Sequence, residues 1–366
     1  MPDKQQSMHR FLRMLETNLI SQGLKVDVLL PTVFLGKYIK NSFSGIGKYL
    51  AYFDKYLLFP LVLLLKKRMY NNAHSVFHIC DHSNAMYISC LPKGRTIITC
   101  HDVLAIRGAK GFKDAYCEAS YMGKILQNWI LNSLKKVKKI AFVSETTALQ
   151  FSELCKDQKY TGVSEVVYNS LNGHFYPIEI NHALNVLNAY PLLQTEPFIL
   201  HVGSGLPRKN RKLVIEMLIL LKNKWIGNIC FVGDALDEES QRLLENHGLT
   251  NRAVVINSAS HQVLLSLYRL CSSFVFPSFS EGFGWPVIEA QASGASVITS
   301  SIQPMPEIAG KLALCANPHE PQEFADAFIY LQDLNNRNLN IEQGLENAKR
   351  FEMSSMVNNY LKLYNL

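Results

Sequence analysis

Short apolar runs alternate with segments of helical periodicity along this chain of 366 residues. A run of roughly four to eight apolar residues between turn residues is typical of a buried strand, and apolar positions three or four apart are typical of a helix. The strand pattern occurs at 25–31, 75–81, 95–102, 138–144, 164–170, 198–204, 228–234, 253–258, 272–278 and 295–300. The helical pattern lies between these runs, for example at 7–22, 115–134, 260–270 and 321–334. This alternation predicts an α/β protein with parallel sheets covered by helices.

One stretch near the middle of the chain carries turn residues instead of either pattern. Residues 172–196 include Asn172, Gly173, Pro177 and Pro191, and we interpret them as a linker. A chain of this length can bury two cores, so we expect two doubly wound, Rossmann-like domains that face each other across a cleft. The expected units are an N-terminal acceptor-binding domain at 1–175, a C-terminal nucleotide-sugar-binding domain at 176–350, and a C-terminal helix at 351–366 that packs back on the N-terminal domain. Ligands of such open sheets bind outside the carboxyl ends of the strands.

Within residues 278–300, a glycine turn leads from an apolar run into a helical pattern. Glu281 precedes the Gly-Phe-Gly turn and Glu289 follows it, while Pro286 and Gly294 mark the start and the end of the helix. A glycine turn at a helix N-terminus offers free N–H groups to an anion. The two carboxylates can accept hydrogen bonds from hydroxyls, and a sugar nucleotide carries phosphate and hydroxyl groups side by side. The alternative interpretation is an ordinary strand-to-helix turn with exposed acids.

The two glutamates and the turn, an E-x7-E segment, resemble the donor-site signature of family-4 retaining glycosyltransferases (glycosyltransferase group 1), which have the GT-B fold. Other segments of the second half resemble the same family at 198–210, 264–278 and 305–310. Segments of the first half match it more loosely at 44–50, 99–102, 142–147 and 166–177. The resemblance covers nearly the whole chain and implies an enzyme of the bacterial polysaccharide type. Its expected reaction moves a hexose from a nucleotide diphosphate sugar to a glycan or lipid-linked acceptor, with retention.

Two adjacent cations follow a predicted strand in the second half. By the resemblance, Arg208 and Lys209 neutralise the diphosphate leaving group, and Gly203 belongs to the same donor-binding loop. Negative charge develops on the leaving oxygen, so fixed cations at that point lower the barrier. Many relatives carry a further arginine where this chain has Ser204, so that one cation is either absent or replaced by Arg211. The alternative is an exposed basic start of a helix.

The resemblance also assigns roles around the glycine turn. Glu281, as a catalytic residue, accepts a hydrogen bond from a hydroxyl of the donor sugar, and Glu289 accepts hydrogen bonds from the ribose hydroxyls. The N–H groups that meet the sugar and the β-phosphate belong to Gly282, Phe283 and Gly284. The nucleotide base lies along 257–261. We expect no metal and no cofactor beyond the nucleotide sugar, because cations and a helix terminus meet the phosphate charge and the chain contains no Asp-x-Asp.

The residues that face the acceptor are expected in the first half. His101 ends the run 95–102, and position and resemblance together suggest that it contacts the reacting sugar or helps the acceptor hydroxyl to lose its proton. A lone histidine is otherwise structural. Further candidates for the acceptor side are Ser7, Ser44, Gly45 and His82. The family opens with a strand, but only MPDKQQ precedes the helix at 7–23, so we expect the first strand to be missing and the sheet to have a gap.

The composition describes a globular protein, with 48% hydrophobic and 18% charged residues. The eight cysteines include no Cys-x-x-Cys pair and mostly lie in apolar runs. They are interpreted as small buried side chains in a reducing compartment. The first residues lack the apolar segment of a signal peptide, so we expect a cytoplasmic protein.

The net charge of +7 is divided unevenly along the chain. Residues 1–177 hold 23 Lys and Arg against 12 Asp and Glu (+11), whereas the remainder holds 14 against 18 (−4). Residues 56–70 join three cations to an apolar run that is short of the roughly 20 residues needed to span a bilayer, and residues 134–142 add four lysines. We interpret this charge pattern as a binding surface for an anionic membrane, the inner face of the plasma membrane. The alternative is a core helix with a solvated basic end.

Other functions were weighed against the transferase. Nothing resembles a nucleic-acid-binding motif, so no nucleic-acid partner is expected. One alternative is a catalytically inactive relative that serves as a binding or scaffold subunit, which a missing strand would favour. Another is a nucleotide-sugar epimerase, but the paired acid and base carboxylates of such an enzyme cannot be assigned here. The donor-site resemblance favours the transferase.

Overall fold

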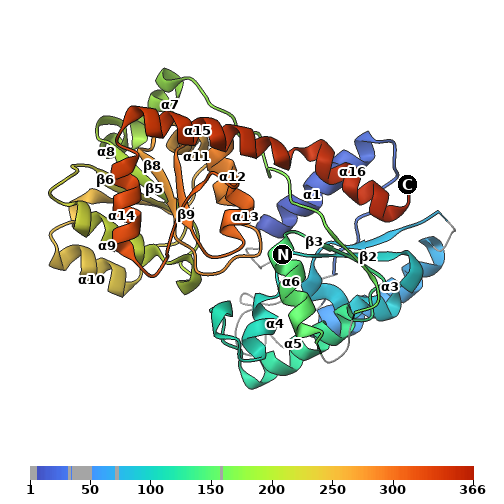
Figure 1. Ribbon diagram of the computed structural model, residues 1–366. Coiled ribbons are helices and arrows are strands. Elements are labelled where there is room, and N and C mark those ends of the chain that lie inside the picture. The colour runs from blue at the N-terminus through green and yellow to red at the C-terminus, as the bar shows by residue number, and fades with distance from the viewer. Residues whose placement is uncertain (1–5, 32–33, 35–51, 71–73, 157–159) are drawn as a thin grey trace.

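The computed structural model describes residues 6–31, 34, 52–70, 74–156 and 160–366. In these residues two sheets form the centres of two domains (Figure 1). The N-terminal sheet has the strand order β1-β2-β3-β4, and the C-terminal sheet has the order β10-β9-β8-β5-β6-β7. Every strand pair in both sheets is parallel. The α/β architecture with parallel sheets is therefore confirmed, and its helices connect successive strands.

The strands of the N-terminal sheet fall within four of the predicted apolar runs or at their edge. They are β1 (Phe77–Ile79), β2 (Thr96–Cys100), β3 (Lys139–Phe142) and β4 (Val163–Val166). Ile98 on β2 pairs with Ile140 on β3, and both side chains are fully buried. They belong to one core with Leu131, Leu134 and Phe151, which come from helices. Burial of each such side chain contributes roughly 1.5–3 kcal/mol, which holds the helices to the sheet.

The helices of the N-terminal domain largely follow the helical pattern. They are α1 (Gln6–Ser21), α3 (Phe59–Tyr70), α4 (Leu104–Ala109), α5 (Tyr121–Leu134) and α6 (Glu145–Leu154). The helix predicted from residue 115 begins only at Tyr121. Tyr116 has a left-handed backbone (φ 47°), which a helix does not accommodate, and Ser120 caps the helix by accepting a hydrogen bond from the Gly123 N–H.

The strand predicted at 25–31 is wrong. These residues form an irregular stretch that pairs with no strand in the described part of the chain. Val26 packs against the cluster formed by α1 and the C-terminal helix, and Leu29 packs against the core of the N-terminal domain. The apolar pattern here thus reflects packing of an extended segment, because a strand also needs a neighbouring edge with which to form hydrogen bonds.

The C-terminal sheet matches the predicted runs of the second half and adds one short strand. Its members are β5 (Phe198–Val202), β6 (Asn228–Val232), β7 (Ala253–Ile256), β8 (Ser273–Phe276), β9 (Val297–Ser300) and β10 (Leu314–Ala316). The helices α9 (Arg211–Leu221) and α14 (Pro321–Tyr330) share one core with the sheet, and α11 (His261–Leu270) and α12 (Trp285–Ala292) share another. The strand β10 has only three residues, too few to show a sequence pattern.

The predicted linker at 172–196 is only partly a linker. It contains α7 (Ile180–Val186) and α8 (Pro191–Thr195), which belong to the C-terminal domain. Ala183, Leu187 and Leu193 are buried there in the same core as Phe198 of β5. The turn residues therefore indicated the start of this segment correctly. The helices α7 and α8 were not predicted, because they are too short to show a helical pattern.

The chain returns to the N-terminal domain at its end. Helix α15 (Leu334–Ala348) leads from the C-terminal domain toward α16 (Met353–Tyr364), which lies beside α1 (Figure 1). Tyr360 and Leu363 of α16 are buried in one cluster with Phe11 of α1 and Ile97 of β2. The Tyr360 hydroxyl also lies 2.8 Å from the Thr99 hydroxyl on β2. The last helix is thus part of the N-terminal packing.

Candidate functional site

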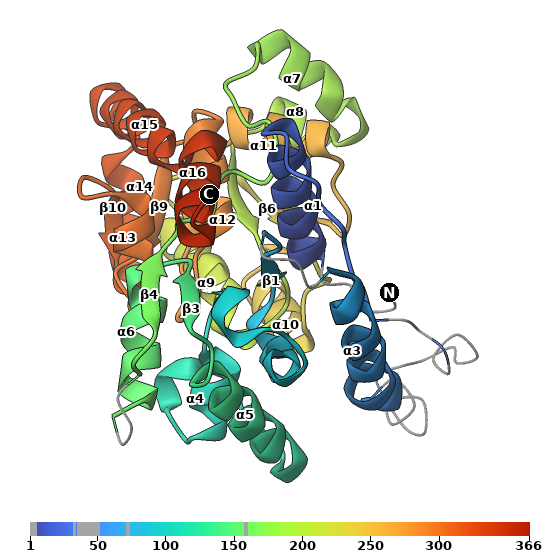
Figure 2. The ribbon, with the colours of Figure 1, turned by 90° about the vertical axis from the view of Figure 1, so that its right-hand side faces the viewer.

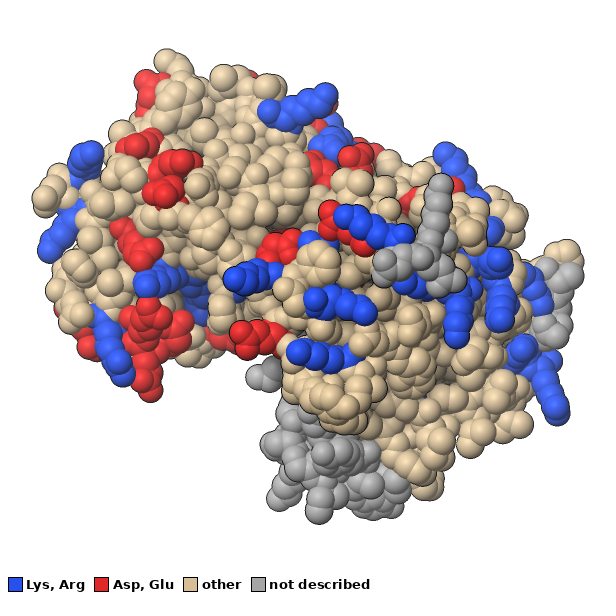
Figure 3. Space-filling model, turned by 60° about the horizontal axis from the view of Figure 1, so that its bottom comes forward, with Lys and Arg blue, Asp and Glu red and all other residues tan. Residues whose placement is uncertain are grey.

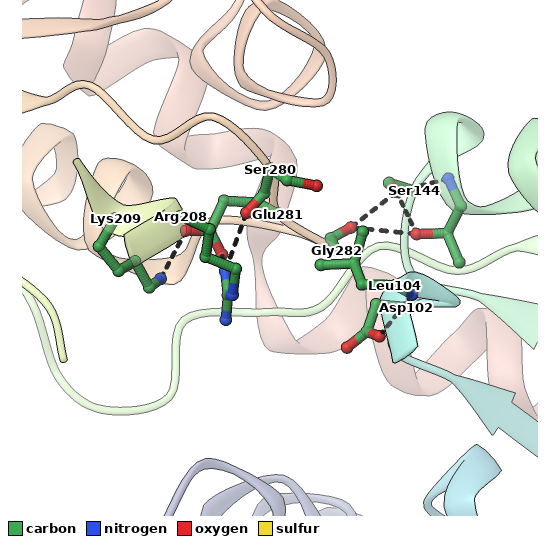
Figure 4. A network of polar contacts seen from close by, with 9 residues as sticks. Asp102, Leu104, Ser144, Arg208, Lys209, Ser280, Glu281 and Gly282 are labelled. Carbon is green, nitrogen blue, oxygen red and sulfur yellow. Dashed lines mark hydrogen bonds and ion pairs between the residues drawn. The ribbon is translucent and has the colours of Figure 1, made fainter. Parts of the chain in front are cut away.

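Three loops meet where the two domains face each other. They follow the carboxyl ends of β2, β5 and β8, the position at which open parallel sheets bind ligands. The loop after β5 carries Arg208 and Lys209, and the loop after β8 carries Glu281 and Gly282. Figure 4 shows these side chains together with Asp102 and Ser144 of the N-terminal domain. The structure therefore assembles residues from both halves of the chain in one place.

A carboxylate bridges the two adjacent cations. Arg208 Nη1 donates to Glu281 Oε2 at 2.8 Å, and Lys209 Nζ donates to Glu281 Oε1 at 2.5 Å. Arg208 Nη1 also donates to the Ser280 carbonyl at 2.9 Å (Figure 4). The Glu281 and Lys209 side chains are 7% and 12% exposed. This geometry contradicts the alternative of an exposed basic start of a helix.

The electrostatics of this cluster favour an anionic ligand. Burial by itself raises the pKa of Glu281, but the charges of Lys209 and Arg208 outweigh it and lower the pKa to about 2. Burial lowers the pKa of Lys209, against the opposing effect of Glu281. Glu281 is therefore ionised at neutral pH. Two cations and one carboxylate leave one net positive charge in a mostly buried place.

The turn after Glu281 requires glycine at two positions. A Cβ atom on Gly282 would lie 2.0 Å from the His101 carbonyl oxygen, and one on Gly284 would lie 2.5 Å from Met305 Cε. Gly284 also has a left-handed backbone (φ 105°) where it begins α12. Phe283 between them is buried at 5% exposure. No hydrogen bond joins the three N–H groups of this turn to another described residue.

Glu289 occupies a more apolar place than Glu281. It is 4% exposed on α12, and the Tyr268 hydroxyl donates to its Oε2 at 3.2 Å. Burial raises its pKa to about 7, partly opposed by hydrogen bonds from Tyr268 and Asn172. The folded protein therefore holds a proton here that the unfolded chain releases near pH 4.5. The corresponding contribution to the free energy of unfolding is lost as the pH rises from about 4.5 to about 7.

His101 is buried at the end of β2 and presents one unpaired nitrogen. Its Nε2 lies 2.9 Å from the Cys80 carbonyl, and a carbonyl only accepts, so Nε2 carries the proton. Nδ1 is buried and has no partner in the described residues. Burial is the main cause of the lowered pKa of His101, so the neutral ring is favoured. Phe11 packs edge-on against the ring at 4.7 Å. The free Nδ1 is thus a hydrogen-bond acceptor.

Of the other predicted acceptor residues, His82 lies close enough to His101 for its charge to affect the pKa of that ring. His82 follows β1, with Nδ1 3.6 Å from Asp81 Oδ1. Ser7 is exposed on α1. Ser44 and Gly45 lie outside the described residues. Helix α1 contributes instead through Phe11, whose ring touches His101, and through the charge of Arg10 close to Glu289.

The loop that begins at Gly203 is tightly packed, but Arg211 does not join the two cations. A Cβ on Gly203 would lie 3.1 Å from His201 Nε2. Arg211 is 6% exposed, stacks over Phe231 at 4.9 Å and donates through Nη1 to the Ala235 carbonyl at 3.1 Å. It contacts the end of β6 instead of Glu281. Its Nε and Nη2 are buried and have no partner among the described residues, so a role in place of the arginine that relatives carry at position 204 stays a prediction.

Sequence analysis missed the groups of the N-terminal domain that touch the glycine turn. The hydroxyls of Ser144 and Thr147 donate to the Gly282 carbonyl at 2.8 and 3.2 Å. Asp102 lies beside Gly282 and accepts a hydrogen bond from the Leu104 N–H at 3.0 Å. A serine at the end of a predicted strand is also a residue type that caps a following helix. It gives no sign of a second partner in another domain.

Two other kinds of site are absent from the described residues. Throughout the described ranges, no three His, Cys, Asp or Glu side chains lie together as ligands of a metal ion. None of the helices in the described part of the chain has the length and apolarity needed to cross a bilayer. The cysteines are all free, and Cys117 alone among them is exposed.

Known proteins resemble this chain both in the sequence of its C-terminal domain and in its fold. Residues 187–348 match the family described as glycosyl transferases group 1. The serotype-specific mannosyltransferase WbdA of Escherichia coli is 26% identical over 239 residues, which cover 63% of this chain and 28% of WbdA. The chain thus spans little more than a quarter of that relative.

A second relative is of more similar length. The N,N'-diacetylbacillosaminyl-diphospho-undecaprenol alpha-1,3-N-acetylgalactosaminyltransferase of Campylobacter jejuni is 24% identical over 265 residues, 70% of this chain and 68% of that protein. Among solved structures, Anabaena HepE in complex with UDP and glucose superimposes with a TM-score of 0.67 at 15% identity, over 96% of this chain and 88% of HepE. These likenesses confirm the expected fold, two Rossmann-like domains in the GT-B arrangement.

Proposed function

We propose that this chain, whose residues 187–348 match the glycosyl transferases group 1, is a retaining enzyme of bacterial polysaccharide synthesis. It moves a hexose from a nucleotide diphosphate sugar to a glycan or lipid-linked acceptor. The observation that carries this proposal is the Glu281 carboxylate held between Arg208 and Lys209. It combines surplus positive charge with an acceptor for hydroxyls, beside a glycine turn that opens a helix.

The donor-binding roles follow from the position of each group. Arg208, Lys209 and the N–H groups of the turn bind the diphosphate. When the bond from the anomeric carbon to the β-phosphate oxygen breaks, the electron pair stays on that oxygen, and the two cations stabilise the new charge. Glu281 accepts a hydrogen bond from a sugar hydroxyl and Glu289 from the ribose. Retention is inferred from the resemblance of the E-x7-E segment to retaining enzymes.

His101 is proposed to act as a neutral acceptor at the reacting sugar. Its Nε2–H is occupied by the Cys80 carbonyl, which leaves the buried Nδ1 lone pair for a hydroxyl. A ring with a lowered pKa is a poor proton donor at neutral pH. His101 therefore orients the sugar or accepts a hydrogen bond from the acceptor hydroxyl as that group loses its proton. The gathering of cations, carboxylates and this histidine favours catalysis over an inactive scaffold.

A screen of nucleotide sugars tests the proposed reaction. We expect one nucleoside diphosphate hexose to stabilise the protein, by about 2.7 kcal/mol at one hundred times its Kd, and to be hydrolysed slowly. Excess EDTA should leave both effects unchanged, because Arg208, Lys209 and the turn meet the phosphate charge. Thermal unfolding and release of the nucleotide, each with and without EDTA, measure this. Loss of turnover with EDTA that magnesium or manganese restores would refute the metal-independent site.

A membrane-facing surface suits a lipid-linked acceptor. Helix α3 buries Phe59 and Leu63 but leaves most of its other apolar side chains exposed, which favours an interfacial helix over the core helix of the alternative interpretation. Exposed apolar side chains extend over α3 and α5, namely Leu61, Leu64, Leu65 and Met69, and Tyr121, Met122, Ile125 and Trp129. The Tyr56 and Trp129 rings, 5.5 Å apart, connect the two parts. Both helices lie at the lower end of the N-terminal domain (Figures 1 and 2). We call the exposed apolar side chains of these two helices the apolar surface.

The charge around the apolar surface fits anionic lipid. Lys66, Lys67 and Arg68 end α3, and Lys124 lies on α5. Figure 3 shows basic side chains gathered over the N-terminal domain, whereas acidic side chains are mixed with them on the C-terminal domain. Lys139 is an exception among the predicted cations, because its ammonium donates to the Leu363 carbonyl at 2.7 Å. Each cation near such a membrane contributes about 1 kcal/mol. We propose docking on the cytoplasmic face, where nucleotide sugars are supplied.

Vesicle sedimentation tests this docking. We expect binding to anionic vesicles, weaker binding to neutral ones, and loss at 1 M salt, where the Debye length is roughly 3 Å. The double variant Leu65→Glu/Met69→Glu should bind about tenfold more weakly or worse, because two side chains 68% and 77% exposed no longer enter the lipid. The matched control is Ile226→Glu, an 81% exposed apolar residue of the C-terminal domain. Equal binding to both vesicle types would contradict the proposal.

A further inference from the structure

The turn that carries Glu281 is held from the other domain. The carbonyl of Gly282, the next residue, accepts hydrogen bonds from Ser144 Oγ at 2.8 Å and Thr147 Oγ1 at 3.2 Å (Figure 4). Ser144 and Thr147 stand at the start of α6 and are both fully buried. Their hydroxyl oxygens lie 2.9 Å apart, and because each hydroxyl has one hydrogen, donation to the carbonyl excludes donation between them. Two buried hydroxyls of the N-terminal domain therefore converge on one carbonyl of the C-terminal domain.

The same peptide is confined on its other side by β2. A Cβ on Gly282 would lie 2.0 Å from the His101 carbonyl oxygen and 2.7 Å from Asp102 Cβ. Backbone meets backbone here, so the gap admits only glycine. The peptide that follows Glu281 thus lies between the end of β2 and the start of α6. A shift of the turn by even 1 Å would break one contact or create a clash.

Two further contacts hold the domains together on either side of this peptide. The ring of Tyr116 stacks on Phe279, two residues before Glu281, with centroids 4.7 Å apart and planes 9° apart. Glu307 of α13 (Met305–Ala309) accepts hydrogen bonds from the N–H groups of Glu145 and Thr146 at 2.6 and 3.1 Å. These contacts place α6 and the glycine turn in one fixed relation.

We propose that Ser144 and Thr147 are positioning residues for Glu281. The inference rests on the proposed function, because it concerns the contact of Glu281 with the donor sugar. The closed pair of domains, and not the C-terminal domain alone, then completes the sugar half of the donor site. Catalysis is sensitive to such placement, since an error of about 1 Å at a reacting group can cost on the order of 10²-fold in rate.

The proposed role affects the two parts of the donor, the nucleoside diphosphate and the sugar, to different extents. Arg208, Lys209 and Glu289 all belong to the C-terminal domain, so binding of a nucleoside diphosphate without its sugar depends on α6 only through the N–H groups of the glycine turn. Contact with the sugar passes through Glu281 and so depends on Ser144 and Thr147. A residue that only stabilised the fold would change both affinities together.

The variant Thr147→Val tests the proposal because it removes the hydroxyl and keeps the size of a fully buried side chain. We expect kcat/KM for the nucleotide sugar to fall about tenfold, the loss of one positioning hydrogen bond. The Kd of the nucleoside diphosphate should stay within about twofold. Thr147→Ser should restore turnover. Ser144→Ala also removes a helix cap, so its control is Ser120→Ala, which removes the cap of α5 without touching the turn.

Hydrogen exchange gives a measurement that does not need activity. Peptides that span 279–284 and 144–148 should exchange faster in Thr147→Val than in the wild type, and at the wild-type rate in Thr147→Ser. Unchanged exchange in Thr147→Val, or equal loss of affinity for nucleoside diphosphate and nucleotide sugar, would overturn the positioning role. Absence of turnover in the wild type would instead overturn the proposed function, and exchange would still decide whether the hydroxyls fix the turn.

Discussion

Replacing Lys209 with alanine is expected to lower kcat/KM by on the order of 10²-fold or more, the effect of removing a fixed charge from a developing oxyanion. Lys209 is the more enclosed of the two cations, with its side chain 12% exposed against 22% for Arg208. Arg208 alone would then face the diphosphate, while Glu281 cancels its charge. Steady-state kinetics with the nucleotide sugar identified in the screen measures the loss.

The control for this variant is Lys212→Ala. Lys212 lies three residues further along, is 47% exposed and pairs with Glu239 on the surface, so its loss should leave turnover unchanged. Removal of Lys209 also leaves a buried carboxylate with one partner fewer, and we expect a loss of stability of roughly 3 kcal/mol. Assays must therefore be run well below the melting temperature of the variant. Near-normal kcat/KM in folded Lys209→Ala would refute the cation assignment.

Replacing Glu281 with glutamine is expected to lower kcat/KM by a similar factor, on the order of 10²-fold or more. The amide is nearly the same size, but it accepts through one oxygen only and carries no charge. It can no longer accept hydrogen bonds from Arg208 and Lys209 and from a sugar hydroxyl at the same time. The matched control is Glu239→Gln, an exposed carboxylate that is 72% accessible in its pair with Lys212.

The pH dependence of unfolding offers an independent check on Glu281. Its folded pKa of about 2 lies below the ordinary value of 4.5, so its ion pairs stabilise the protein above pH 4.5. This contribution is lost as the pH falls toward about 2. The free energy of unfolding should thus depend less steeply on pH in Glu281→Gln over this range. Identical slopes for the variant and the wild type would show that the bridge does not form in solution.

Much of the C-terminal domain could be predicted because its signals are local. The strands β5, β6, β8 and β9 are buried on both faces, so each has a continuous apolar run. The glycine turn and the two glutamates lie within a few residues of one another, so backbone geometry alone brings them to one end of a helix. By contrast, the run at 25–31 has the same apolar character and forms no strand, because strand pairing requires a neighbour that the local sequence does not specify.

The electrostatic character of the site was not predictable from its residues. Glu281 and Glu289 have the same side chain and lie in one short motif, yet their pKa values are about 2 and about 7. Glu281 sits between two cations, whereas Glu289 faces a tyrosine hydroxyl in a buried place. A pKa depends on burial and on charges within a few ångströms, and the sequence does not give either.

The alternation of strands and helices, the glycine turn with its flanking carboxylates and the adjacent cations after β5 could be predicted from the sequence alone. Each depends on residues close together in the chain. The folded structure was needed to show that Arg208 meets Glu281, that α16 packs beside α1, and that Ser144 reaches Gly282. Ser144 and Gly282 are 138 residues apart in the sequence. This last contact forms only when both domains have folded and closed, because no local preference of the backbone can encode the distance between two separate cores.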